Sequence, residues 1–192
     1  MAHIRVPDEN LQIDDPKEIG EFLERFGIWC EQWAVRGRVS EGATNDEILE
    51  AYADEIDRLK ARHGFVTADV INVTPDIPGL DEMLAKFTEE HTHTEDEVRF
   101  IVKGRGIFHI HPEGAPVFSI ETCAGDMINV PAGTRHWFHL CEEREIQAIR
   151  LFLDKSGWTP HYVEQGVHGR YAPVCFGPDY LPLDRSRIDP VV

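Results

Sequence analysis

The first third of the chain carries apolar residues at helical spacing. In its first segment, four apolar residues recur three or four positions apart and would share one helix face: Ile19, Phe22, Leu23 and Phe26. Pro16, which suits a first helical turn, and Gly27, which favours a helix end, bound this segment. A second helix is predicted from the capping box at 44–47 to about residue 59, and a short third helix from 81 to 87.

The middle of the chain changes to short apolar runs separated by turn residues. These runs predict strands at 69–73, 98–102, 106–110, 117–121, 127–130, 136–140 and 146–153. The turns between them contain Gly and Pro, for example at 104–106 and 131–133. Because no helical pattern separates the predicted strands, we expect a mainly β fold: a closed antiparallel barrel or jelly roll with N-terminal helices.

Length and composition indicate one domain. The 192 residues suffice for one well-packed domain and are too few for two ordinary ones. We expect a helical N-terminal elaboration at 1–66, a metal-binding barrel at 67–160 and a surface tail at 161–192. No apolar run reaches the length of a membrane span and the first residues lack a secretory apolar segment, so a cytoplasmic protein is expected.

Charge and cysteine content narrow the function classes. The net charge of −16 argues against nucleic acid and against an anionic membrane surface as partners. The four cysteines form no C-x-x-C pair, so a zinc ribbon or a thioredoxin-like site has no support: Cys30, Cys123, Cys141 and Cys175. We expect four reduced thiols, several of them buried as small apolar residues.

The strongest chemical pattern is the run EHTHTEDE at 90–97, together with the distant His136. Alternate residues of extended chain share a face, so His91, His93 and Glu97 can all point inward. On a helix, His91 and His93 would diverge. Three imidazoles and one carboxylate suit divalent Fe, Ni, Mn or Zn. We therefore predict a mononuclear metal site inside a β-barrel, with His136 supplied by another strand.

Arg99 is the predicted catalytic residue. It follows Glu97 by two positions, so a regular strand would place both side chains on the inward face. A buried guanidinium beside a metal is costly unless it faces an anion, and a deprotonated substrate is such an anion. The alternative is an internal salt bridge with Glu90, Glu95 or Asp96.

Other residues near these positions have weaker signals. Phe87, Phe138 and Trp158 could line an apolar end of a substrate pocket, although aromatic residues at such positions commonly form plain core. Glu90 and Asp96 flank the predicted ligands and could hydrogen bond with an imidazole N–H.

A second histidine pair follows Gly106. His109 and His111 alternate along a predicted strand, but no carboxylate follows at ligand spacing and Pro112 ends the strand. We expect both to be barrel-surface residues without a metal.

Two segments resemble the paired sequence motifs of the cupin superfamily. The first is His91-x-His93-x3-Glu97-x6-Gly104, and the second is Gly125-x5-Pro131-x-Gly133-x2-His136. The longer strings KFTEEHTHTEDEVRFIVKGRGIFHIH (86–111) and GDMINVPAGTRHWF (125–138) are similar to the acireductone dioxygenase family. This similarity is colinear over roughly residues 15–165 and departs at 138–145 and in the tail.

The resemblance implies a cupin barrel and a dioxygenase of methionine salvage. Members of that family cleave 1,2-dihydroxy-3-keto-5-methylthiopentene with O2. With Fe(II) the products are formate and 4-methylthio-2-oxobutanoate; with Ni(II) they are 3-methylthiopropanoate, formate and carbon monoxide. The resemblance implies one Fe(II) or Ni(II) per chain, held by the four predicted ligands, with iron favoured for the salvage role. It also implies a monomer. The same ligands accept both ions.

Two other function classes remain open. Another metal-dependent cupin enzyme, such as a sugar-phosphate isomerase or a different dioxygenase, could use the same four ligands, with Lys103, Arg105 and Arg135 binding a phosphate. A non-catalytic cupin binding module could lose ligands without penalty, whereas this chain keeps all four.

Overall fold

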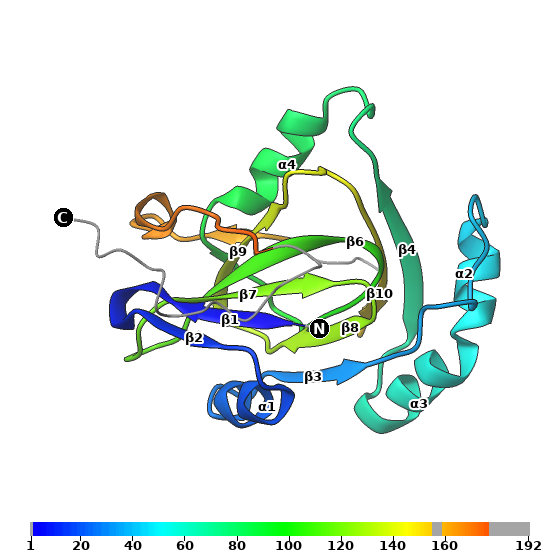
Figure 1. Ribbon diagram of the computed structural model, residues 1–192, viewed down its shortest axis with the longest axis horizontal. Coiled ribbons are helices and arrows are strands. Elements are labelled where there is room, and N and C mark those ends of the chain that lie inside the picture. Colours follow the sequence, from blue (N-terminus) through cyan, green and yellow to red (C-terminus); the bar gives the residue numbers. More distant parts are fainter. Residues whose placement is uncertain (1, 155–158, 177–192) are drawn as a thin grey trace, which may run out of the picture.

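The computed structural model describes residues 2–154 and 159–176. Its described part contains four α-helices: α1 (Pro16–Glu24), α2 (Asn45–Ala51), α3 (Ala53–His63) and α4 (Leu80–Thr88). The strands are β1 (His3–Val6), β2 (Leu11–Ile13), β3 (Trp29–Gln32), β4 (Thr67–Val73), β5 (His91–Thr92), β6 (Glu97–His111), β7 (Phe118–Cys123), β8 (Asp126–Val130), β9 (Arg135–Leu140), β10 (Ile146–Phe152) and β11 (His161–Tyr162). Figure 1 shows the strands curving around a common interior, with helices on the outside. The predicted fold class, a mainly β cupin barrel with N-terminal helices, is confirmed.

Strand β6 is the longest element and runs through both halves of the barrel. Its first half pairs with β8 and β10, and its second half pairs with β7 and β9. The sequence predicted two strands interrupted at 104–106, and this was wrong. Gly104 lets the strand bend without ending. Its φ of +78° is one that glycine adopts without strain, and a Cβ at this position would meet the backbone carbonyl of Glu145.

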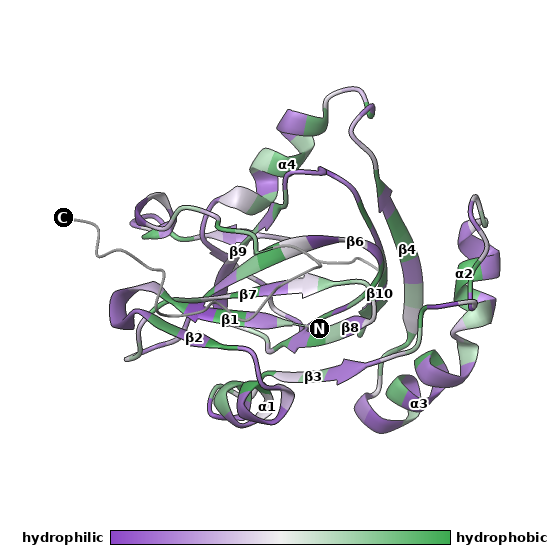
Figure 2. Ribbon diagram, in the orientation of Figure 1, coloured by the Kyte–Doolittle hydropathy of each residue, from purple (hydrophilic) through white to green (hydrophobic). Residues whose placement is uncertain are grey.

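Two hydrophobic clusters hold the fold together. One fills the barrel interior and extends under β1, β2 and α1, with Ile101, Phe108 and Ile128 among its fully buried members. The other joins α2 and α3 to the outer face of the barrel through Tyr52 and Phe100. Both hydrophobic and hydrophilic bands appear along strands such as β4, as expected for strands with two different faces (Figure 2).

The helices differ from the prediction in one respect. The apolar stripe at 44–59 predicted one helix, but α2 and α3 are separate helices that meet at Tyr52. Tyr52 has φ −114° and ψ 18°, outside helical values, and its ring packs on Phe100 and Trp33. The Thr44–Glu47 capping box is present at the start of α2. No helix of the described residues is long and apolar enough to cross a membrane.

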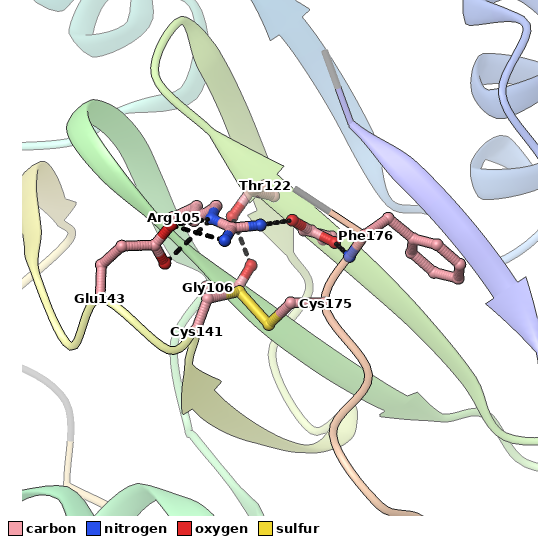
Figure 3. Close-up of a disulfide and its surroundings, with 8 residues drawn as sticks. Arg105, Gly106, Thr122, Cys141, Glu143, Cys175 and Phe176 are labelled. Carbon is pink, nitrogen blue, oxygen red and sulfur yellow. Dashed lines mark hydrogen bonds and ion pairs between the residues drawn. A yellow bond between two sulfur atoms is a disulfide. The ribbon is translucent and has the colours of Figure 1, made fainter. Parts of the chain in front are cut away.

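The cysteines also differ from the prediction. Cys141 and Cys175 form a disulfide, with their Cα atoms 6.0 Å apart, so the expectation of four reduced thiols was wrong (Figure 3). Cys30 and Cys123 are not in a disulfide. The pair is separated by 34 residues, and only the fold brings the turn after β9 next to the C-terminal segment. Spacing along the chain could not reveal that contact.

Candidate metal centre

The four predicted ligands meet on adjacent strands. His91 lies in β5, directly opposite His136 in β9, and His93 follows β5 by one residue. Glu97 is the first residue of β6. All four side chains are buried, with relative exposures between 1% and 4%.

The potential donor atoms converge. The imidazole donor atoms of His91, His93 and His136 lie within 4.8 Å of one another. Oε2 of Glu97 is 3.2 Å from Nε2 of His93 and 3.1 Å from Nε2 of His136. The carboxylate therefore lies against the same small space that the imidazoles surround.

Backbone carbonyls fix the orientation of each ring. Nδ1 of His91 donates to the carbonyl of Glu89 at 2.7 Å, and Nδ1 of His136 donates to that of Thr134 at 2.8 Å. Nδ1 of His93 donates to the carbonyl of Thr159 at 3.0 Å. A carbonyl oxygen can only accept, so each Nδ1 carries a proton and each ring turns its Nε2 toward the shared space.

The charges of the site favour cation binding. Burial, and then the neighbouring His136, lower the pKa of His91 to about 4, so this ring is neutral near pH 7. Burial alone would raise the pKa of Glu97, but Arg99 and the hydrogen bonds with His136 and His93 hold it well below its usual range. Burial alone would lower the pKa of His93, but the hydrogen bond with Glu97 and the charge of Glu97 together outweigh burial and raise it above its usual value. Metal ligation needs neutral imidazoles and an ionised carboxylate, so an ion that binds would displace any proton from Nε2 of His93. The donor set therefore fits a divalent transition metal.

Arg99 lies beside this centre inside the barrel. Its Nη2 donates to Oε1 of Glu97 at 2.6 Å, and its guanidinium carbon lies 5.0 Å from the ring centroid of Phe138 and 5.4 Å from that of Phe108. The sequence offered Glu90, Glu95 or Asp96 as salt-bridge partners, but the structure pairs Arg99 with Glu97. One carboxylate oxygen of Glu97 thus faces the guanidinium of Arg99, while the other faces the imidazoles.

The weaker candidates lie in different places. Phe138 is 6% exposed and packs against Arg99, and the Phe87 ring lies 6.5 Å from that of His91. Trp158 lies outside the described residues. The Glu90 carboxylate hydrogen bonds with Nδ1 of His111 and with the backbone of the C-terminal segment, and Asp96 accepts from the backbone N–H of Ala132.

Two features of the site were not predicted. The partners of the ligand N–H groups are backbone carbonyls, which carry no side-chain signal, and one of them comes from Thr159, far along the chain. The expectation that His109 lies on the barrel surface was wrong: it is 2% exposed and stacks on Trp137 at 4.9 Å. It is on the outer face of the wall, but the C-terminal segment covers it, and Tyr171 packs on the same Trp137.

Comparison with known proteins gives a consistent result. The sequence model of the ARD/ARD' family matches residues 5–160. The acireductone dioxygenase of Picosynechococcus sp. is 43% identical over 171 residues, which cover 89% of this chain and 97% of that relative. The one from Xylella fastidiosa is 42% identical over 189 residues, which cover 95% and 96%.

A solved structure agrees with these sequence matches. The acireductone dioxygenase from Bacillus anthracis, with a cadmium ion in its active centre, aligns with a TM-score of 0.80 and 38% identity. The alignment covers 84% of this chain and 98% of that one. The chain therefore belongs to the ARD/ARD' family and is an enzyme of the dioxygenase class.

Proposed function

We propose that this protein is an acireductone dioxygenase of methionine salvage, which uses O2 to cleave 1,2-dihydroxy-3-keto-5-methylthiopentene. The observation that carries the proposal is the convergence of three buried imidazoles and Glu97 on one small space beside Arg99. The names of the relatives support the substrate class.

His91, His93, Glu97 and His136 are the proposed ligands of one Fe(II) or Ni(II) ion. When bound, the ion would supply a Lewis acid that favours the deprotonated form of an enediol. We propose the iron form for salvage, with formate and 4-methylthio-2-oxobutanoate as products. The nickel form would give 3-methylthiopropanoate, formate and carbon monoxide. The same donor set accepts either ion, so supply decides which form exists.

Arg99 is the proposed anion-binding residue. Its hydrogen bond with Glu97 and the flanking rings of Phe108 and Phe138 keep its guanidinium inside the barrel. There it can donate to a deprotonated substrate oxygen, and a charge-assisted hydrogen bond is strong in a site from which water is excluded. Arg99 thus favours the deprotonated, electron-rich form of an enediol, which is the form that reacts with O2.

The apolar part of the substrate needs apolar surroundings. Phe138 beside Arg99 and Phe87 near His91 are proposed to contact the methylthio group, and Trp158 is proposed from the sequence alone. A hydrophobic lining also excludes water from the reacting atoms.

The wider context is part of the same proposal. We propose a monomer that acts on a small molecule and O2 in the cytoplasm. The Cys141–Cys175 disulfide is unusual for a reducing compartment.

The experiment is oxygen uptake by Fe(II)-loaded protein on an acireductone analogue, corrected for the spontaneous oxidation of the enediol. We expect uptake far above this background, and we expect His91→Ala to lose it together with most of its bound metal, because one donor of a buried site is missing. Metal content is measured by elemental analysis of the same samples.

The matched control is His63→Ala, which removes an imidazole that stacks on Trp29 in the helical elaboration. This variant should keep both metal and uptake. Normal turnover by metal-depleted His91→Ala, or one bound metal per chain without uptake above background, would overturn the proposed function.

A further inference from the structure

The C-terminal segment 159–176, here called the strap, lies against the strands that carry the metal ligands. Its strand β11 pairs antiparallel with β5, so Tyr162 lies opposite His91. At its start, the carbonyl of Thr159 accepts the hydrogen bond from Nδ1 of His93. The backbone of the strap therefore contacts two of the three histidines proposed as ligands.

Glu90 is the main attachment of the strap beside the site. It is 1% exposed, and its carbonyl accepts from the N–H of Val163 at 2.9 Å. Its carboxylate accepts from the N–H of Val167 at 2.6 Å, and its own N–H donates to Nδ1 of His168 at 3.3 Å. Because Glu90 precedes His91 directly, these three hydrogen bonds make the position of His91 depend on the strap.

The far end of the strap is fixed to the barrel by a covalent bond. Cys175 is joined to Cys141, whose N–H donates to the carbonyl of Arg105 in β6. Arg105 itself forms ion pairs with Glu121 at 3.0 Å and with Glu143 at 2.6 Å around the disulfide (Figure 3). The disulfide thus ties the strap to a part of the wall that its own ion pairs hold in place.

A groove gives small molecules access to this bond. It has a volume of about 470 Å³ and is lined by Leu84 and Thr88 of α4, by β9, and by Pro173 and the two cysteines. Cys141 is 2% exposed, whereas Cys175 is half-buried. A thiolate that enters the groove can therefore reach the sulfur of Cys175 more easily, and disulfide exchange depends on such access.

We propose that the Cys141–Cys175 disulfide is a redox modification site that controls how firmly the strap holds the metal ligands. A thiolate attacks Sγ of Cys175, the S–S bond breaks and the electron pair leaves on Sγ of Cys141, which takes a proton. A second thiolate then resolves the mixed disulfide. The result is two cysteine thiols in the chain and one disulfide of the small thiol.

Reduction should loosen the strap without releasing it. Once the covalent link is gone, its far half is held by non-covalent contacts such as the hydrogen bond from the Tyr171 hydroxyl to Asp8. The N–H of Phe176 also donates to the Glu121 carboxylate, and Tyr171 packs on Trp137. A segment held by non-covalent contacts alone opens more often than one that is also cross-linked.

The loosening reaches His91 and His93 through Glu90 and Thr159, so metal should leave the reduced protein faster. This last step rests on the proposed metal ligands, whereas the loosening of the strap does not.

The test compares the protein before and after treatment with a phosphine reductant, which binds metal ions less than dithiols do. Alkylation under native and under denaturing conditions, followed by measurement of the intact mass, counts the free thiols of each sample. Hydrogen exchange of peptides from 159–176 should accelerate by about tenfold. In nickel-loaded protein, transfer of Ni(II) to a chelator should accelerate by roughly fivefold.

Matched variants separate the disulfide from the other thiols. The double variant Cys141→Ser/Cys175→Ser should show the fast exchange and the fast metal transfer without reductant and should not respond further. Cys30→Ser/Cys123→Ser keeps the disulfide and should respond to reductant like the original chain.

Three results would contradict the proposal or part of it. Unchanged hydrogen exchange in the strap after complete reduction would overturn the proposal, and so would a purified protein in which all four cysteines alkylate before reduction. Faster exchange with unchanged metal transfer would overturn the link to the metal. Oxygen uptake is not used as a readout here, so failure of the proposed reaction would appear separately.

Discussion

Glu97 has the most demanding position of any single residue in the centre, because its two oxygens serve different partners. Oε1 accepts from Arg99, while Oε2 lies near the Nε2 atoms of His93 and His136. A buried carboxylate is costly unless its oxygens are paired. The arrangement holds Glu97 ionised and at the same time holds Arg99 where an anionic substrate would be bound.

Substitution of Arg99 tests that role. In Arg99→Met we expect kcat/KM for oxygen uptake to fall by about 100-fold or more, because the anionic substrate loses its charge-assisted hydrogen bond. Bound metal should stay near one equivalent, since Arg99 is not a ligand. Steady-state kinetics and metal analysis of the same preparation check both parts.

The matched variant for this prediction is Arg99→Lys. It keeps the positive charge without the planar fork of donors, so it should recover part of the lost kcat/KM. If Arg99 served only as an internal ion pair for Glu97, Arg99→Met would lower stability and leave kcat/KM of the folded, loaded protein nearly unchanged.

At the scale of elements, β6 organises the barrel, because one strand pairs with four others. Its passage between the two halves depends on Gly104, where a Cβ would lie within 3.0 Å of backbone atoms of Glu145 and Ile146. Backbone atoms cannot move aside as a flexible side chain can. The bend of β6 therefore requires glycine at this position.

The pair Gly104→Ala and Gly20→Ala tests this requirement. Gly104→Ala should lower the free energy of unfolding by about 2 kcal/mol or more, because it combines a positive φ with a backbone clash. Gly20 lies in α1 with nothing within 4 Å of an added Cβ, so Gly20→Ala should raise it by about 0.5–1 kcal/mol. Urea unfolding measures both, and equal effects would contradict the argument.

Elements that are determined by their own residues could be predicted from the sequence, whereas elements that depend on distant partners could not. Helix α1 depends on its own capping residue and apolar stripe, and the strands of the middle segment on their own alternation and turns. Strands β3 and β11 were missed because they are short, lack buried residues and are stabilised mainly by pairing with β8 and β5. Such pairing partners are set by the whole fold and leave little trace in the segment itself.

The same reasoning explains the candidate site. The spacing of His91, His93 and Glu97 pointed to one face, and the structure brings them to His136. The strap contacts could not be predicted, since Thr159 and Cys175 reach the site region through chain that has no periodic pattern.

On the scale of the whole molecule, buried histidines stay neutral although the protein is strongly acidic. The chain carries a net charge of −16, yet burial, and then the neighbouring His139, lower the pKa of His109 to about 3. Burial also lowers the pKa of His139. These rings are neutral in the folded protein and gain a proton more readily when the chain unfolds.

Stability should therefore fall as the pH falls below about 6.5. Between pH 7.5 and 5.0 the unfolded chain binds a proton at His109 that the folded protein does not, which lowers the free energy of unfolding by about 2 kcal/mol for this one residue. His109→Phe keeps an aromatic ring against Trp137 and removes the titration. Urea unfolding at the two pH values should show a pH dependence smaller by that amount, and an unchanged dependence would refute the assignment.

The hydrogen bonds from the three ligand rings to main-chain carbonyls have a further consequence. Because of these hydrogen bonds, the folded backbone itself orients the three imidazoles. An ion that binds therefore meets preorganised ligands and does not have to order them. Such a centre can exchange its occupant without refolding. If the proposed ligands accept either ion, the divalent ions available around the finished protein would decide which of the two proposed reactions it performs.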